Sequence, residues 1–223
     1  MIAPSDVTIR TFQESDAPRV KELFRSGMTS LIPNFYKLSL LHYPMSQAVW
    51  GISLTQLIGL AMAEQLQFVP LVGIVTAAYA GYLYYRVRQQ IQTYIKTETE
   101  KNLFNISETY VYKGGTFLVA VHEGRIVGIV GGENRTNGVM ELKRMIVDVS
   151  IHSRGLGTTI VEVLQDHAIR LGFSKISLAT SNAQPAAKRL YTKCGFQLVK
   201  ETDLHIPGAK LCFYEKILEA TKQ

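Results

Sequence analysis

The chain of 223 residues has few of the features that mark metal sites, disulfide-rich folds or nucleic-acid surfaces. Its only two cysteines, Cys194 and Cys212, form no CxxC pair and have no histidine at a ligand spacing, so we expect neither a metal site nor a disulfide framework. The net charge of +6 is mild, and no cluster of five or more Lys or Arg residues occurs. We therefore expect no binding to nucleic acid, and we expect the basic excess to favour ligand phosphates and lipid headgroups.

Charge is also missing from a long stretch of the chain. Residues 38–85 contain no Lys, Arg or Asp and one Glu, Glu64, whereas the average of 19% charged residues would place about nine there. The apolar runs 49–63 and 68–85 would reach about 22 and 27 Å as helices, close to the thickness of a hydrocarbon core. This pattern predicts a pair of membrane-embedded helices. A pair of core helices in a soluble protein is the alternative.

Both apolar runs carry small residues at every fourth position. The set comprises Gly51, Thr55, Gly59 and Ala63 in the first run and Gly73, Ala77 and Gly81 in the second. Small residues let helices in lipid approach closely, so we expect these stripes to bring the two helices together.

A strand, a loop with two glycines and an amphipathic helix lie within 141–172, and Gly172 ends the helix. Gly155 and Gly157 leave backbone N–H groups open, and the helix macrodipole favours negative charge there, so the loop suits a phosphate or pyrophosphate. No Lys follows Gly157 as in a Walker A loop, and a third glycine of the Rossmann type is absent. An ordinary tight turn between strand and helix is the alternative.

A second motif, Leu-Tyr-Thr-Lys-Cys-Gly-Phe at 190–196, follows a β-branched strand and a short helix. Together with His152-Ser153-Arg154-Gly155-Leu156-Gly157, five residues after Val147, it closely resembles the GNAT superfamily of acetyl-CoA-dependent N-acetyltransferases. That family's pyrophosphate loop reads Q/R-x-x-G-x-G/A, so His152 is a departure from it. The apolar insert, the phrase Glu141-Leu142-x-Arg144-Met145-x-Val147 and Gln184 are similar to the camello, or N-acetyltransferase 8, branch.

The resemblance implies an α/β fold with a mixed, mostly antiparallel central sheet flanked by helices. Residues 1–37 would supply its first strand and helix, 38–85 an inserted two-helix membrane hairpin, and 86–223 the acetyltransferase core. Both flanks of the insert would then lie on one side of the bilayer.

Acetyl-CoA is the co-substrate that the resemblance implies, and no metal is expected. The residues implied to bind acetyl-CoA are Val147, His152, Ser153, Arg154, Gly155, Leu156, Gly157, Thr158 and Gln184. For Arg154 the alternative is a solvated loop residue, and for Gln184 a surface helix start.

Acetyl transfer to an amine needs a base, a stabilised oxyanion and a protonated leaving thiolate. The resemblance implies that Glu141 is the base, directly or through water, and we expect its side chain on the same strand face as that of Val147. Tyr191 would protonate the thiolate, and Arg144, facing away from Met145, would meet a substrate carboxylate. The alternatives are an edge-strand carboxylate in solvent for Glu141 and a core aromatic for Tyr191.

These inferences predict a membrane-anchored N-acetyltransferase that acetylates a primary amine by direct attack in a ternary complex. The acceptor would be a small amino-acid derivative such as a cysteine conjugate, or a protein lysine. A CoA-binding membrane scaffold without turnover is the alternative. Basic residues at both outer ends of the insert favour a cytosolic catalytic domain on the endoplasmic reticulum, whereas glycosylation sequons at Asn105 and Asn134 favour the lumen.

Overall fold

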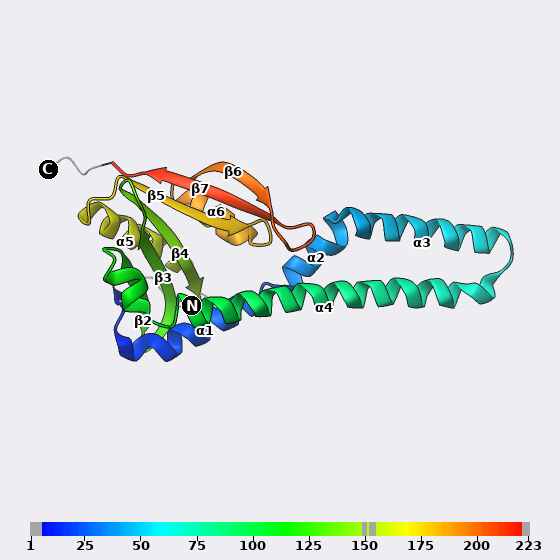
Figure 1. Ribbon diagram of the computed structural model, residues 1–223, viewed down its shortest axis with the longest axis horizontal. Coiled ribbons are helices and arrows are strands. Elements are labelled where there is room, and N and C mark those ends of the chain that lie inside the picture. The colour runs from blue at the N-terminus through cyan, green and yellow to red at the C-terminus, as the bar shows by residue number, and fades with distance from the viewer. Residues whose placement is uncertain (1–5, 149–150, 152–154, 220–223) are drawn as a thin grey trace.

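The computed structural model describes residues 6–148, 151 and 155–219. Its centre is a seven-stranded sheet with the strand order β1-β2-β3-β4-β5-β7-β6 (Figure 1). Neighbours β4 and β5 run parallel, and the other neighbouring pairs run antiparallel, which confirms the mixed, mostly antiparallel sheet. The strands are β1 Thr8–Thr11, β2 Thr116–His122, β3 Arg125–Asn134, β4 Val139–Val147, β5 Lys175–Ser181, β6 Gln197–Asp203 and β7 Lys210–Ile217.

Helices cover both faces of this sheet. They are α1 Ala17–Thr29, α2 Ile32–His42, α3 Pro44–Met62, α4 Val69–Lys101, α5 Leu156–Arg170 and α6 Pro185–Lys193, with single turns η2 Glu14–Asp16, η3 Leu66–Phe68 and η4 Ser107–Val111. One core lies between the sheet and the pair α5 and α6, and includes Leu142, Ile160 and Tyr191. A second core, including Phe24 and Ile129, lies on the opposite face under α1.

Two tight turns join β2 to β3 and β3 to β4. Glu123 and Gly124 have φ of 48° and 75° between β2 and β3, and Asn137 and Gly138 have φ of 62° and 69° between β3 and β4. Left-handed backbone of this kind matches the twist of two paired strands, which is why short polar and glycine residues occur at such turns.

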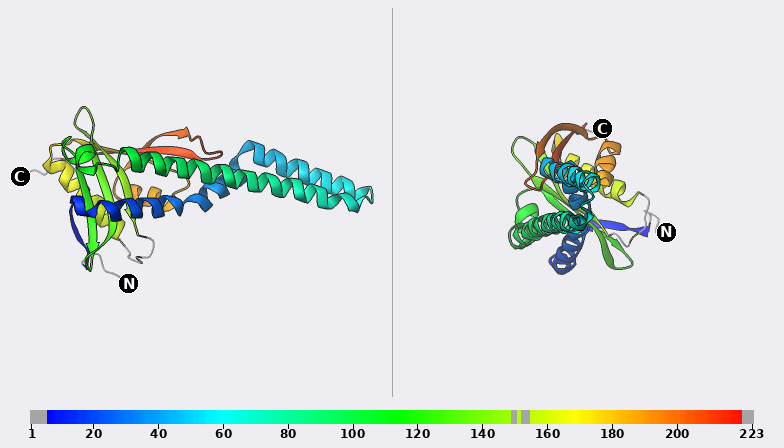
Figure 2. Two further views of the ribbon diagram at one scale, coloured as in Figure 1. Left: turned by 60° about the horizontal axis from the view of Figure 1, so that its bottom comes forward. Right: turned by 90° about the vertical axis from the view of Figure 1, so that its right-hand side faces the viewer.

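Helices α3 and α4 run side by side away from the sheet and are joined at the far end by residues 63–68, as Figure 1 and the left view of Figure 2 show. Hydroxyl groups join the two helices: Ser53 and Thr76 lie 2.9 Å apart, and so do Ser46 and the Tyr79 hydroxyl. A third apolar cluster, including Phe35, Val87 and Ile91, packs at the base of this pair.

The segment boundaries expected at 37/38 and 85/86 fall inside α2 and α4, and α4 continues without a break from the apolar run to Lys101. The structure corrects one expectation for this region. The glycines of the small-residue stripes do not bring the helices together: a Cβ added at any of Gly51, Gly59, Gly73 or Gly81 would meet no atom within 4 Å. The hydrogen bonds described between α3 and α4 instead join Ser53 to Thr76 and Ser46 to Tyr79.

Candidate functional site

The parallel strands β4 and β5 separate at the centre of the sheet. In the described residues their pairing covers only 139–142 of β4 and 175–178 of β5, although both strands continue beyond it. On the other side of β4, the Asp148 N–H donates to the Val127 carbonyl at 2.8 Å. Because N–H groups of successive strand residues point to opposite sides, the Val147 N–H points away from β3 and into the opening.

A β-bulge lies in β4 where the opening begins. Arg144 and Met145 both face the single residue Val130 of β3, and Arg144 has a φ of 56°. The extra residue reverses the alternation of side chains after it. Met145 and Val147 therefore pack in the α5 core together with Leu142. The expectation that Glu141 and Val147 share a face was wrong, because the sequence showed no sign of the bulge.

The first turn of α5 lies beside Met145 of β4, and the first backbone N–H groups of a helix have no partner within the helix. Gly155 occupies the N-cap position with a φ of 107°, a conformation that a residue with a Cβ rarely adopts, and it has no side chain to cap the helix. A Cβ at Gly157 would lie 3.2 Å from Leu190 and 3.7 Å from Met145. The glycine loop, the bulge and the Leu-Tyr motif therefore meet at one point. His152, Ser153 and Arg154 lie outside the described residues.

Tyr191 lies in the last turn of α6 and is buried, with 5% of its surface exposed. Its ring packs edge-on against Phe196 at 5.9 Å between centroids and lies 6.4 Å from the ring of Tyr214. Burial raises the pKa of the Tyr191 phenol above its ordinary value, and the nearby Cys194 adds to the rise. The phenol is therefore kept in its protonated form.

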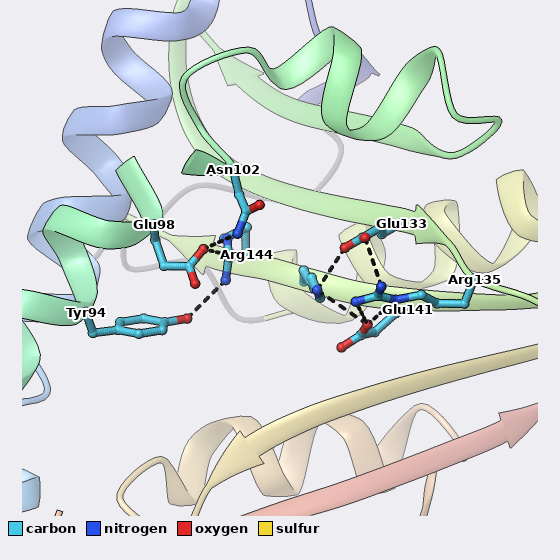
Figure 3. Close-up of polar contacts among 8 residues, drawn as sticks. Tyr94, Glu98, Asn102, Glu133, Arg135, Glu141 and Arg144 are labelled. Atoms are coloured by element: carbon cyan, nitrogen blue, oxygen red, sulfur yellow. Dashed lines mark hydrogen bonds and ion pairs between the residues drawn. The ribbon is translucent and has the colours of Figure 1, made fainter. Parts of the chain in front are cut away.

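Glu141 lies on β4 within a cluster of four charged side chains (Figure 3). Arg135 approaches its carboxylate at 2.6 Å and Lys143 at 3.4 Å, and both cations also contact Glu133 of β3, at 3.2 and 2.8 Å. Because β4 lies between β3 and β5, Glu141 is not on an edge strand, and its side chain is 25% exposed. Sequence reasoning missed these three partners: Lys143 lies two residues along β4 on the same face as Glu141, and the β3–β4 register brings Glu133 opposite Glu141. Arg135 follows β3 in the turn between the two strands.

A family model described as the Acetyltransferase (GNAT) family matches residues 82–196, more than half of the chain. The chain belongs to this family. It is thus an acetyl-CoA-dependent acyltransferase, as the motifs indicated.

Relatives place the chain within this GNAT family. It is 30% identical over 200 residues to N-acetyltransferase family 8 member 3 of Mus musculus, covering 87% of this chain and 86% of the relative. It is 28% identical over 214 residues to N-acetylaspartate synthetase of Homo sapiens, covering 95% and 69%. The predicted camello and N-acetyltransferase 8 branch is confirmed. A GNAT acetyltransferase from Staphylococcus aureus Mu50 has the same fold, with a TM-score of 0.58, 18% identity and coverage of 96% and 99%.

Gln184, which the GNAT resemblance placed near the pantetheine, lies at the N-cap of α6. Its side-chain oxygen accepts hydrogen bonds from the Thr180 hydroxyl at 2.9 Å and from the Ser181 N–H at 3.5 Å. Gln184 therefore holds the turn between β5 and α6, close to where β5 has left β4.

Arg144 reaches away from Met145, as expected, but its guanidinium already has partners (Figure 3). It forms an ion pair with Glu98 and donates a hydrogen bond to the Tyr94 hydroxyl at 3.0 Å, both from α4, and it lies 5.5 Å from the Phe24 ring centre. Its side chain is only 8% exposed. Burial alone would lower the pKa of Arg144, but Tyr94, Tyr110 and Glu98 outweigh it, so the pKa is raised.

In the described part of the chain, no group of three or more His, Cys, Asp or Glu side chains is arranged to hold a metal ion.

Proposed function

We propose that the chain is a membrane-anchored N-acetyltransferase that transfers the acetyl group of acetyl-CoA directly to a primary amine in a ternary complex. The observation that supports this most is the meeting of the β4–β5 opening with the uncapped first turn of α5. The opening offers strand main-chain groups to an extended thioester arm, and the helix N-terminus offers N–H groups to a pyrophosphate. Val147, Gly155, Leu156, Gly157, Thr158 and Gln184 would form this site, with His152, Ser153 and Arg154 completing the loop.

In the proposed reaction the amine nitrogen attacks the thioester carbonyl, an N–C bond forms and the C–S bond breaks. A lysine-type amine with a pKa near 10.4 is unprotonated in only about one molecule in a thousand at neutral pH, so a base must take its proton. Glu141 would accept that proton, directly or through a water molecule. The Val147 N–H would stabilise the oxyanion, since it points into the opening.

Tyr191 would supply the proton that the departing thiolate takes up. The raised pKa of its phenol makes full transfer to a thiolate, whose conjugate thiol has a pKa of about 8.5, energetically uphill. The Tyr191 hydroxyl would therefore first donate a hydrogen bond to the thioester sulfur. This hydrogen bond strengthens as the C–S bond breaks and negative charge develops on the sulfur, so the uphill proton transfer is not needed earlier.

The acceptor would be a small amino-acid derivative or a protein lysine. One relative is named for the synthesis of N-acetylaspartate, which supports an amino acid as the acceptor. Free thiol release should be measured with full-length protein, acetyl-CoA and a panel of aspartate, cysteine S-conjugates and lysine peptides. We expect release above background with at least one amine. Acetyl-CoA binding without release from any amine would support the non-catalytic scaffold instead.

Helices α3 and α4 are proposed to be the membrane anchor. The segment Leu66–Lys101 is long and apolar enough to cross a membrane, with a mean hydropathy of 1.5 in its most apolar window, and 6% of that window is buried. Large apolar side chains such as Leu54, Ile58, Leu71 and Ile74 are exposed on both helices. An apolar surface of this extent is costly in water, whereas a core pair of helices would be covered, so lipid is the proposed environment.

Lysines placed in this surface should weaken the anchor. We expect wild-type protein to stay in the membrane pellet after an alkaline carbonate wash, and the double variant Leu54→Lys/Ile74→Lys to shift to the supernatant, because each charge costs about 3 kcal/mol at the bilayer centre. Gln92→Lys, at an exposed α4 position beyond the apolar run, is the matched control and should stay in the pellet. Wild-type protein in the supernatant would contradict the anchor.

The catalytic domain is proposed to face the cytosol at the endoplasmic reticulum. Lys37, Arg86 and Arg88 lie at the base of the hairpin and no basic residue lies at its tip, which matches the positive-inside rule. Both Asn105 and Asn134 are exposed, so burial would not prevent their modification in the lumen. We expect no change in gel mobility after glycosidase treatment of protein from eukaryotic cells. A glycosidase-sensitive shift that is lost in Asn105→Gln or Asn134→Gln would place the domain in the lumen.

A further inference from the structure

The bulge in β4 places Arg144 in a backbone conformation that residues other than glycine rarely adopt. Arg144 has a φ of 56°, in the left-handed region, and the corresponding position of such bulges is usually glycine because a Cβ is crowded there. Strained residues persist where the surrounding structure holds them. Arg144 is held by Glu98 and Tyr94, which bind its guanidinium, and by Phe24, whose ring lies against it.

The bulge also decides which way the residues after it point. A strand alternates with a period of two, so one extra residue reverses the direction of each following side chain and N–H group. Without the bulge, Val147 would turn its N–H toward β3 and not into the β4–β5 opening. The direction of the β4 main-chain groups that line the opening therefore depends on the conformation of Arg144.

We propose that Arg144, Glu98 and Tyr94 are positioning residues, through which α4 holds the β4 bulge and keeps the acetyl-CoA opening in its binding form. This inference rests on the acetyl-CoA placement proposed above. It gives Arg144 a role other than contact with a substrate carboxylate, because its guanidinium is buried and paired with Glu98. Asn102 donates a hydrogen bond to Glu98 at 2.6 Å and so orients the carboxylate in turn (Figure 3).

The same contact makes the proposed anchor part of the catalytic framework. Helix α4 has no proline or glycine between Gly81 and its end at Lys101, so it continues unbroken from the apolar run to Glu98. From Tyr85, at the end of that run, to Glu98 the helix rises about 20 Å. A change in the position of α4 would therefore act on Arg144 and, through it, on the opening.

A matched pair of variants at Arg144 tests the role of the bulge. Arg144→Ala and Arg144→Gly both remove the guanidinium and leave Glu98 without its cation, but glycine alone adopts a positive φ freely. By calorimetry on full-length protein in detergent, we expect Ala to weaken acetyl-CoA affinity about 10-fold and Gly to stay within about 3-fold of wild type. Equal affinities for the two variants, whether lowered or unchanged, would overturn the proposal.

A second pair tests the contact from α4. Glu98→Gln should weaken acetyl-CoA binding by about 3- to 10-fold, because it removes the charge that holds the buried guanidinium. Glu100→Gln makes the same charge change at an exposed position of α4 and should leave the affinity unchanged. If Glu98→Gln lowers only the melting temperature and not the acetyl-CoA affinity of the folded protein, the contact is merely structural and the proposal fails.

These measurements need no acceptor amine. A wild-type protein that binds acetyl-CoA but acetylates no amine would therefore contradict the proposed reaction. The positioning role could still be tested, because it is measured by acetyl-CoA affinity. A fully active wild type whose Ala and Gly variants bind alike would contradict the positioning role alone.

Discussion

Replacing Tyr191 with phenylalanine should lower kcat by about 10- to 1000-fold while acetyl-CoA affinity stays nearly unchanged. The substitution removes only the hydroxyl. The ring keeps its packing against Phe196 and Tyr214, so a role confined to the core would be preserved. Steady-state kinetics with saturating amine, together with calorimetric titration of acetyl-CoA, measure the two quantities separately.

The pH dependence gives an independent check on the same residue. Burial raises the pKa of Tyr191, so the phenol remains protonated at every pH below its ordinary value of about 10. We therefore expect no alkaline loss of kcat from this group between pH 7 and 10. Turnover of Tyr191→Phe equal to wild type would remove Tyr191 from the mechanism and leave it as a core residue.

Glu141→Gln should lower turnover by about 100-fold at neutral pH, because the amide has nearly the size of the carboxylate but cannot accept a proton from the amine. The loss should appear in kcat and in kcat/KM for the amine, with little change in acetyl-CoA affinity. Initial rates over a range of amine concentrations give both constants.

The control for this variant is Glu133→Gln, which makes the same charge change in the same cluster. Glu133 faces Glu141 across the β3–β4 pair, binds the same two cations and has a similar exposure of 19%. We expect it to lose less than about 10-fold, since it would act on catalysis only through Arg135 and Lys143. Equal losses in the two variants would assign the effect to the charged cluster and not to a base at Glu141.

Part of the architecture followed from local patterns in the sequence. Apolar spacing predicted α5, and Gly172 predicted its end. The glycine loop and the Leu-Tyr motif indicated the family, which the comparisons confirm. Their convergence at Leu190 and Gly157 is a tertiary contact, yet their order in the chain was enough to predict that they belong to one site.

The sequence by itself thus determined the apolar insert, because charge depletion is visible along the chain, and its motifs resembled a family whose fold implied the sheet class. Only the tertiary structure showed that Glu141 and Val147 lie on opposite faces of β4. The bulge at Arg144 reverses the alternation between them, and no glycine marks its position in the sequence. Tertiary structure alone also brought Glu98 to Arg144 and Glu133 to Glu141. Such pairings depend on strand register and helix packing, which join residues distant in sequence and leave no local pattern.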